Sequence, residues 1–118
     1  MLQVFGIKNC NTVKKAIDWL NANKLAYTFN DYKKTPITKE KLIEWNEKLS
    51  WDKLINKKGT TWRKVPLEDQ EKIVDFNSAA ELIMRNNSLL KRPVIEVNNE
   101  LIIGFNEQEY QTKLRDKQ

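Results

Sequence analysis

The chain has no histidine and a single cysteine, Cys10, among its 118 residues. Without histidine, the Cys–His and Ser–His–Asp arrangements that activate nucleophiles in many enzymes are excluded. One cysteine without histidine also excludes a zinc site of the usual kind, so no metal is expected. Because Cys10 has no second cysteine to pair with, any redox chemistry at its thiol must be completed by a thiol from outside the chain.

Glycine and proline are scarce, with three of each, and long apolar runs are missing. No run approaches the roughly 18 apolar residues needed to span a bilayer, so no membrane association is expected. The first residues, 2–5 followed by Gly6, lack the basic and then apolar stretch of a signal peptide. We therefore expect one compact domain in the cytoplasm, a reducing compartment that suits a lone thiol, with disorder only at residues 116–118.

Basic residues outnumber acidic ones by 21 to 16, which gives a formal net charge of +5. The lysines are spread along the chain among acidic residues, without the concentrated stripe or motif typical of nucleic-acid binders. A solvated basic surface is the simplest interpretation, and direct binding of nucleic acid is not expected. An anionic small molecule or an acidic protein partner is the alternative.

Cys10 lies at the junction between an apolar strand candidate, residues 2–5, and a helical segment. From Thr12 to about Asn23 the apolar residues fall on one face, which predicts a helix capped by Asn11 or Thr12. Unpaired backbone N–H groups and the dipole at a helix N-terminus favour a thiolate, and so do nearby lysines. Cys10 is therefore a candidate nucleophile rather than a small buried apolar residue. The lysines concerned are Lys8, Lys14 and Lys15.

The middle of the chain is predicted to be helical. Residues 25–32 alternate loosely and predict a second strand before it. One helix is opened by Thr38, and a short turn of helix covers residues 51–55. A further short helix is predicted to begin near Pro66 and to carry Leu67, Ile73 and Val74. Ser78 and Glu81 have the spacing of a capping box, so the next helix is predicted to begin at Ser78 and to end near Asn86 and Asn87.

The C-terminal part returns to strands. Apolar residues 94–97 and 100–103 flank two asparagines, which suit a hairpin turn because asparagine tolerates positive φ. Asn106 is predicted to cap a last helix with Tyr110 and Leu114 on its inner face. The order β-α-β, helical insert, β-β-α predicts an α/β thioredoxin-like (glutaredoxin-like) fold in a single domain. Its core would comprise residues 1–34 and 91–115, and its inserted helical subdomain residues 35–90. Pro93 precedes the third strand, where this fold commonly carries a cis-proline that faces the active thiol.

Residues 6–16, with Cys10 in the sequence GIKNCNTVKKA, resemble the active-site start of the arsenate reductase (ArsC)/Spx superfamily. The YffB-like branch of that superfamily is the most similar. Its recurring segments are matched by GTTWRK at 59–64, FNSAAEL at 76–82, KRPVI at 91–95 and a Gly104-Phe105 corner. The resemblance spans essentially the whole chain in one order and spacing, and it implies the same thioredoxin-like fold.

The resemblance also implies an activity. In glutaredoxin-linked arsenate reductases, the thiolate that matches Cys10 attacks arsenate, and glutathione and glutaredoxin then regenerate it. A glutathione-dependent thiol reductase is therefore implied, with Cys10 as the catalytic nucleophile and no bound cofactor. Glutathione or a glutaredoxin-like reductant would be the cosubstrate. Of the family's oxyanion-binding arginines only one is matched, by Arg92, while Asn56 and Gly104 stand where the others are expected.

Several residues near the thiol are candidates for binding an anion. Arg92 is expected to hold an anionic substrate beside the thiolate, and the alternative is an exposed residue at a strand start. Arg63 is a second candidate, against a simpler role in which its stem covers Trp62. Lys8 and Asn9 are expected to contribute from the loop before the cysteine.

The Spx branch of the superfamily suggests a different function. Its members are transcriptional regulators that bind the RNA polymerase alpha subunit, and a CxxC disulfide switches many of them. Val13 occupies the position of the second cysteine here, so that switch cannot form. The alternative hypothesis is therefore an Spx-like regulator that binds the polymerase alpha subunit without a redox switch.

Overall fold

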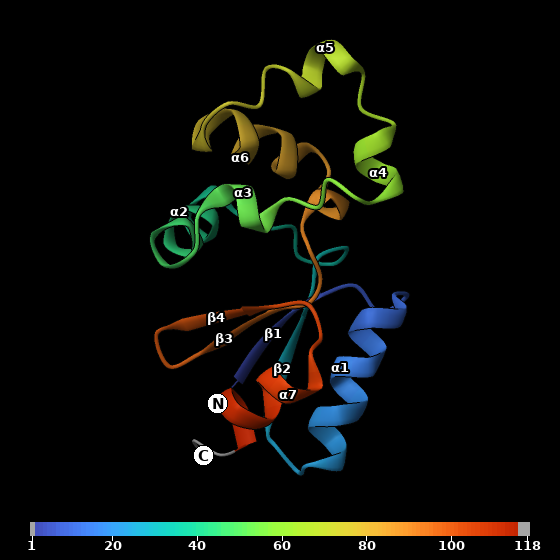
Figure 1. Ribbon diagram of the computed structural model, residues 1–118, viewed down its shortest axis with the longest axis vertical. Coiled ribbons are helices and arrows are strands. Elements are labelled where there is room, and N and C mark those ends of the chain that lie inside the picture. The colour runs from blue at the N-terminus through green and yellow to red at the C-terminus, as the bar shows by residue number, and fades with distance from the viewer. Residues whose placement is uncertain (1, 116–118) are drawn as a thin grey trace. The chain divides into compact units, whose positions relative to one another are not determined.

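The computed structural model describes residues 2–115, and the disorder expected at residues 116–118 lies outside them. The described residues form two compact units (Figure 1). Unit 1 comprises residues 2–35 and 92–115, and unit 2 comprises residues 36–91.

Unit 1 contains a mixed four-stranded sheet in the order β2-β1-β3-β4. Strands β1 and β2 are parallel, whereas β3 is antiparallel to both β1 and β4. A parallel pair needs a crossover connection, which the helix α1 (Asn11–Ala22) supplies. The strands are β1 (Leu2–Gly6), β2 (Tyr27–Asp31), β3 (Val94–Val97) and β4 (Glu100–Ile103).

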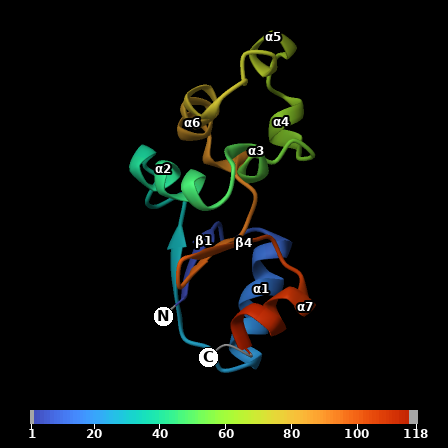
Figure 2. The ribbon, with the colours of Figure 1, turned by 60° about the vertical axis from the view of Figure 1, so that its left-hand side comes forward.

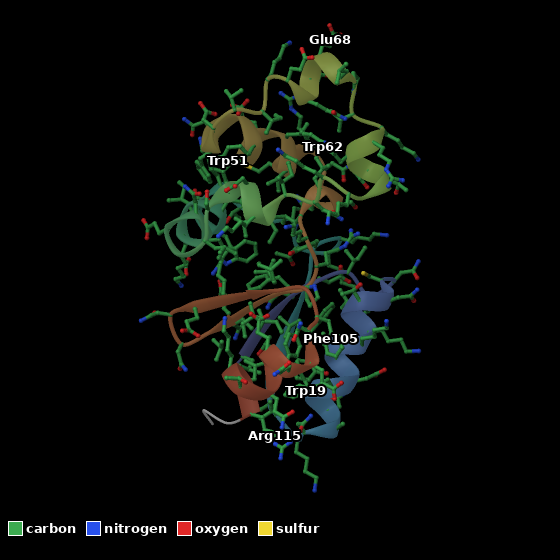
Figure 3. All side chains as sticks on the ribbon, in the orientation of Figure 1. Trp19, Trp51, Trp62, Glu68, Phe105 and Arg115 are labelled. Carbon is green, nitrogen blue, oxygen red and sulfur yellow. The ribbon has the colours of Figure 1, made fainter. Side chains whose placement is uncertain are left out.

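The core of unit 1 forms where α1 and the C-terminal helix pack on one face of the sheet (Figure 2). The C-terminal helix is α7 (Glu107–Tyr110), which continues as a π-helical turn, η2 (Gln111–Arg115). The Tyr110 ring meets Trp19 edge-on at 5.4 Å and Phe105 edge-on at 5.0 Å between ring centroids (Figure 3). Leu2, Val4, Ala16, Leu20, Ile95, Val97, Ile102 and Leu114 complete the core. This arrangement confirms the thioredoxin-like fold.

Unit 2 is made of short helices. Both α2 and α3 contact α6, and α4 contacts η1. An isolated β-bridge joins Ile55 to Leu90. Its helices are α2 (Lys39–Lys48), α3 (Trp51–Leu54), α4 (Thr60–Arg63), α5 (Leu67–Gln70), α6 (Phe76–Arg85) and the 3-10 helix η1 (Asn87–Leu89). No helix among the described residues is long and apolar enough to cross a membrane.

The predicted start of α6 is wrong by three residues. Asp75, not Ser78, is the N-cap, and Ser78 occupies the third helical position. The Asp75 carboxylate accepts from the Ser78 backbone N–H at 2.9 Å, and the Ser78 hydroxyl accepts from the Asp75 backbone N–H at 3.2 Å. This reciprocal capping box uses Ser78 as its second member, and the Ser78–Glu81 spacing is therefore coincidental.

The other helix and strand boundaries differ less from the predicted ones. The helix at Pro66 exists, but α5 ends at Gln70, so Ile73 and Val74 lie beyond it. Strand β2 is shorter than predicted, and α4 has no counterpart in the prediction. The hairpin and the last helix are confirmed: Asn98 has a φ of 51°, and the Asn106 side chain caps α7 by accepting from the Glu109 N–H at 2.9 Å.

Candidate active site

Cys10 occupies the N-cap of α1, with extended backbone at φ −148° and ψ 124°. Its carbonyl accepts the first hydrogen bond of the helix, from the Lys14 N–H at 2.9 Å. The predicted caps are wrong: Asn11 is already helical, and the Cys10 side chain makes no capping hydrogen bond. The N–H groups of the first turn are therefore not satisfied by a side-chain cap, and no acidic residue stands in that turn. The free thiol is only half-buried, and it lies at the positive end of a twelve-residue helix.

The sheet register brings a second segment to the end of the sheet from which the Cys10 loop leaves. Phe5 near the end of β1 is paired with Val94 at the start of β3. Because these strands are antiparallel, the loop after β1, which leads to Cys10, and the residues before β3 leave the sheet at one end. Those residues are Arg92 and Pro93, and the peptide bond between them is cis. Pro93 is buried and Arg92 is half-buried.

Tyr32 follows β2 and lies at the same end of the sheet. Strand β2 flanks β1 on the side opposite to β3. Its backbone N–H donates to the Gly6 carbonyl at 2.9 Å, directly after the parallel pairing of Gly6 with Asp31. The side chain is 3% exposed, and its hydroxyl has no hydrogen-bond partner among residues 2–115. Burial raises the pKa of Tyr32, and the positive charge of Arg92 opposes part of that rise. The edge therefore holds a protonated hydroxyl within electrostatic reach of Arg92, and nothing in the sequence pattern had singled out Tyr32.

The remaining predicted site residues are exposed. Lys8 and Asn9 lie in the loop between β1 and Cys10, as expected. Arg63 is the last residue of α4 and belongs to unit 2. Within that unit the Lys57 Nζ lies 5.6 Å from the centroid of the Trp62 ring. Unit 1 by itself thus places the loop of Lys8, Asn9 and Cys10 and the segment of Arg92 and Pro93 at one end of its sheet.

Asn56 and Gly104, which stand where the family's other arginines are expected, have structural roles. The Asn56 carboxamide oxygen accepts from the Lys58 N–H at 3.2 Å in unit 2. Gly104 has a φ of 77°, a conformation that favours glycine. Its N–H donates to the Pro93 carbonyl at 2.8 Å, and the Tyr110 hydroxyl donates to its carbonyl. Gly104 therefore helps to hold the segment that contains Pro93.

The fold and this arrangement define a class of protein: a thioredoxin-like chain with one cysteine at the N-terminus of its first helix and a helical insertion. The described residues contain no cluster of three or more histidine, cysteine, aspartate or glutamate side chains that could hold a metal ion. The model of the ArsC family matches residues 5–113. The chain belongs to that family.

Similar proteins place the chain within the family. A protein of Haemophilus influenzae, described as uncharacterized, is 39% identical over 111 residues, which span 94% of this chain and 96% of the relative. The global transcriptional regulator Spx of Streptococcus agalactiae is 30% identical over 112 residues, which span 92% of this chain and 80% of the relative. The solved structure of a YffB protein has a TM-score of 0.91 at 37% identity and covers 97% of this chain and 99% of that protein. The chain is thus a YffB-like member of the ArsC family.

Proposed function

We propose that this protein is a cytoplasmic, glutathione-dependent thiol reductase that uses Cys10 as its only nucleophile. The observation that supports this most strongly is the position of the free, half-buried Cys10 thiol at the N-cap of α1. Hydrogen bonds and charge at a helix N-terminus stabilise a thiolate relative to a thiol. The lack of a second cysteine requires that an external thiol completes each cycle.

The reaction balances with glutathione alone as reductant. The Cys10 thiolate attacks the glutathione sulfur of a mixed disulfide, a Cys10–glutathione disulfide forms, and the substrate leaves as a thiolate that takes up a proton. A second glutathione, as thiolate, then attacks the glutathione sulfur of this adduct. The Cys10 thiolate is released, and the glutathione of the mixed disulfide leaves joined to the attacking glutathione as one glutathione disulfide.

Arg92 is proposed to bind the anionic part of the substrate. Arg92 precedes β3 at the end of the sheet where the Cys10 loop also begins, and arginine binds carboxylates and oxyanions with paired hydrogen bonds. The buried Tyr32 hydroxyl supplies a further donor near Arg92. Lys8 and Asn9 would contribute from the loop before Cys10.

The proposal is tested by turnover and by thiol reactivity. Reduction of a glutathione mixed disulfide should be abolished in Cys10→Ser, and mass spectrometry should detect a glutathione adduct on Cys10 of the wild-type protein. Iodoacetamide should alkylate Cys10 faster than it alkylates free cysteine at about pH 6, where an ordinary thiol is almost fully protonated. Alkylation no faster than that of free cysteine, together with turnover that survives Cys10→Ser, would refute the proposal.

A second candidate function is that of an Spx-like regulator that binds the RNA polymerase alpha subunit. The observation in its favour is the 30% identity to Spx of Streptococcus agalactiae over 92% of the chain. Val13, which stands at the second-cysteine position, is buried in α1, so binding would be independent of a disulfide switch. A pulldown with the polymerase alpha C-terminal domain separates the two functions. Binding that survives Cys10→Ser, in a protein without reductase activity, would favour the regulator.

A further inference from the structure

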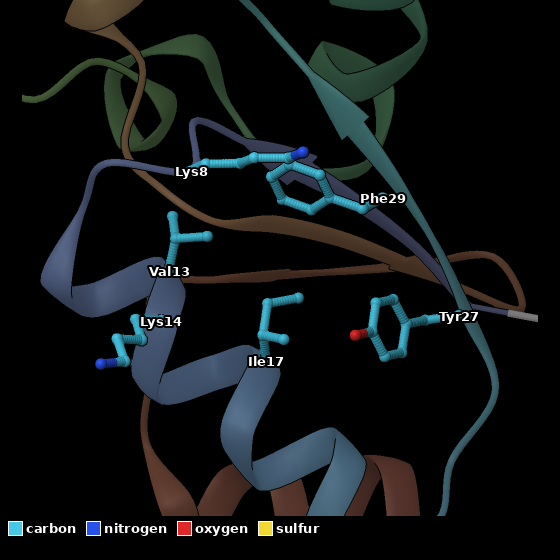
Figure 4. A pocket seen from close by; sticks show the side chains of 6 residues that line it. All are labelled: Lys8, Val13, Lys14, Ile17, Tyr27 and Phe29. Atoms are coloured by element: carbon cyan, nitrogen blue, oxygen red, sulfur yellow. The ribbon is translucent and has the colours of Figure 1, made fainter.

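Unit 1 contains a groove between α1 and the edge strand β2 (Figure 4). Val13 and Ile17 stand one turn apart on α1 and point toward the strand, and Tyr27 and Phe29 point from β2 toward the helix. Because β2 ends the sheet order, no further strand covers this side among the described residues. The groove has a volume of about 280 Å³. Because these four side chains form its floor and no further strand within residues 2–115 covers them, the floor is apolar and open to solvent.

Positive charge borders this apolar floor. Lys8 extends from the loop before Cys10 toward the β2 side of the groove, and Lys14 lines the helix side with its ammonium group turned away from β2. Among residues 2–115 neither lysine forms an ion pair, and no acidic side chain lines the groove. The N-terminal turn of α1 adds partial positive charge at the same end. An occupant with a negative charge would therefore be attracted without having to displace an existing partner of either lysine.

We propose that this groove is a binding site for a small amphipathic anion, that is, an apolar body with one aromatic ring or a short alkyl chain and one terminal anionic group. The apolar body would lie on Val13, Ile17 and Phe29, and the anionic group would lie beside the Lys8 ammonium group, with Lys14 adding positive charge from the helix side. Small-molecule sites combine an apolar lining with a few placed polar groups in this way. The Tyr27 hydroxyl, which points into the groove, offers a hydrogen bond at the other end.

The volume limits the size of the ligand. Ligand pockets usually enclose about 300–1,000 Å³, so a groove of 280 Å³ suits a molecule at the small end of that range. A folded helix or a bulky cofactor would leave most of its surface outside. The site also needs no chemistry at Cys10, because the thiol does not line it. The proposal therefore goes beyond the proposed reductase activity and can fail independently of it.

Titration with phenylbutyrate, followed by amide chemical-shift mapping in NMR, tests the site. We expect saturable shifts at Lys8, at Val13–Ile17 and at Tyr27–Phe29. Phenylbutanol has the same apolar body without the charge, and acetate has the charge without the body. Both should bind at least about tenfold more weakly than phenylbutyrate, since each lacks one half of the interaction. Equal affinity for phenylbutanol would overturn the role of the lysines, and shifts without saturation would overturn the site.

Variants on the groove provide the matched controls. Lys8→Gln combined with Lys14→Gln should weaken phenylbutyrate binding about fivefold or more, because two nearby charges are lost. Lys15→Gln removes one exposed charge from the same helix but not from the groove, and it should leave the affinity within about twofold. Cys10→Ser should bind as the wild type does. Loss of binding in Lys15→Gln, or undiminished binding in the double variant, would refute the assignment.

Discussion

Gly6, the last residue of β1, and Val13, in the first turns of α1, approach so closely that a Cβ on Gly6 would lie 3.0 Å from Val13 Cγ2. Val13 is buried, and its other methyl carbon, Cγ1, would lie 3.5 Å from the same Cβ. The loop that carries Cys10 connects these two residues, so their contact fixes where the N-terminus of the helix meets the end of the strand. A methyl group at Gly6 is therefore accommodated only if the Val13 side chain gives way by a few tenths of an ångström.

We predict that Gly6→Ala destabilises the protein by about 1–3 kcal/mol, the usual cost of an extra buried methyl group in a packed core. Urea unfolding measures the change. In a Val13→Ala background, the same Gly6→Ala substitution should cost less, because the clashing methyl groups are gone. Equal costs in the two backgrounds would show that the Gly6–Val13 contact does not limit this site.

Two buried tyrosines allow a paired prediction. The Tyr32 hydroxyl has no hydrogen-bond partner among the described residues, whereas the Tyr110 hydroxyl donates to the Gly104 carbonyl. Tyr32→Phe should leave the free energy of unfolding unchanged or raise it by up to about 1 kcal/mol, because a buried polar group without a partner is removed. Tyr110→Phe should lower it by about 0.5–1.5 kcal/mol. Thermal denaturation of both variants is the measurement, and a larger loss in Tyr32→Phe than in Tyr110→Phe would contradict the structure.

The capping box of α6 predicts a dependence of stability on pH. Hydrogen bonds from the Ser78 backbone and side chain hold the pKa of the Asp75 carboxyl below its usual range. Because this pKa is lower in the folded than in the unfolded protein, the carboxylate stabilises the fold above the unfolded pKa of about 3.9. That stabilisation is lost as the pH falls through the folded pKa. Asp75→Ala should therefore lower the melting temperature at neutral pH, by a few degrees, and by less in acid.

Asp75→Asn is the matched control for this cap. Asparagine caps helices about as well as aspartate but does not titrate in this range. The melting temperature of this variant should stay close to that of the wild type at neutral pH. On acidification it should fall less than that of the wild type. If Asp75→Ala and the wild type melt alike at neutral pH, the capping box contributes nothing to stability.

The role proposed for Arg92 predicts a dependence on reagent charge. Iodoacetate and iodoacetamide attack the same thiol, but only iodoacetate is an anion. Arg92→Ala should slow alkylation of Cys10 by iodoacetate about twofold to fivefold more than alkylation by iodoacetamide, and added salt should reduce the difference. Arg115→Ala removes an equal charge from the exposed end of η2 and should leave the ratio of the two rates unchanged. Equal slowing of both reagents in Arg92→Ala would contradict a role for Arg92 in binding the anion.

Local sequence signals predicted most of the elements in unit 1. The periodicity of Val13, Ala16 and Leu20 located α1, and the two asparagines at 98–99 located the hairpin. The N-cap residues were harder to predict, because several polar residues often stand near the start of a helix. The sequence alone does not show which of them caps it. The sequence therefore does not distinguish Asp75 from Ser78 as the N-cap of α6, and Cys10 is an N-cap although its side chain does not accept the usual hydrogen bond.

The candidate site was only partly predictable. Cys10 and Arg92 carry recognisable chemistry, and the order of strands placed them at one edge of the sheet. Tyr32 has no sequence signal, because its importance comes from burial and from a missing hydrogen-bond partner. The groove between α1 and β2 arises from tertiary packing, since Lys8 and Phe29 are far apart in the chain yet line the same groove.

The pairing of Gln3 with Glu96 has a consequence for how the protein acquires its fold. Strand β1 lies in the middle of the sheet, yet one of its neighbours, β3, is made only when residues 94–97 are synthesised. A nascent chain can join β1 to β2 early, but it cannot bury the second edge of β1 until β3 leaves the ribosome. Non-local pairings of this kind slow folding and leave unpaired strand edges exposed meanwhile. The last quarter of the chain therefore completes the sheet and, with Arg92, the proposed active site in the same event.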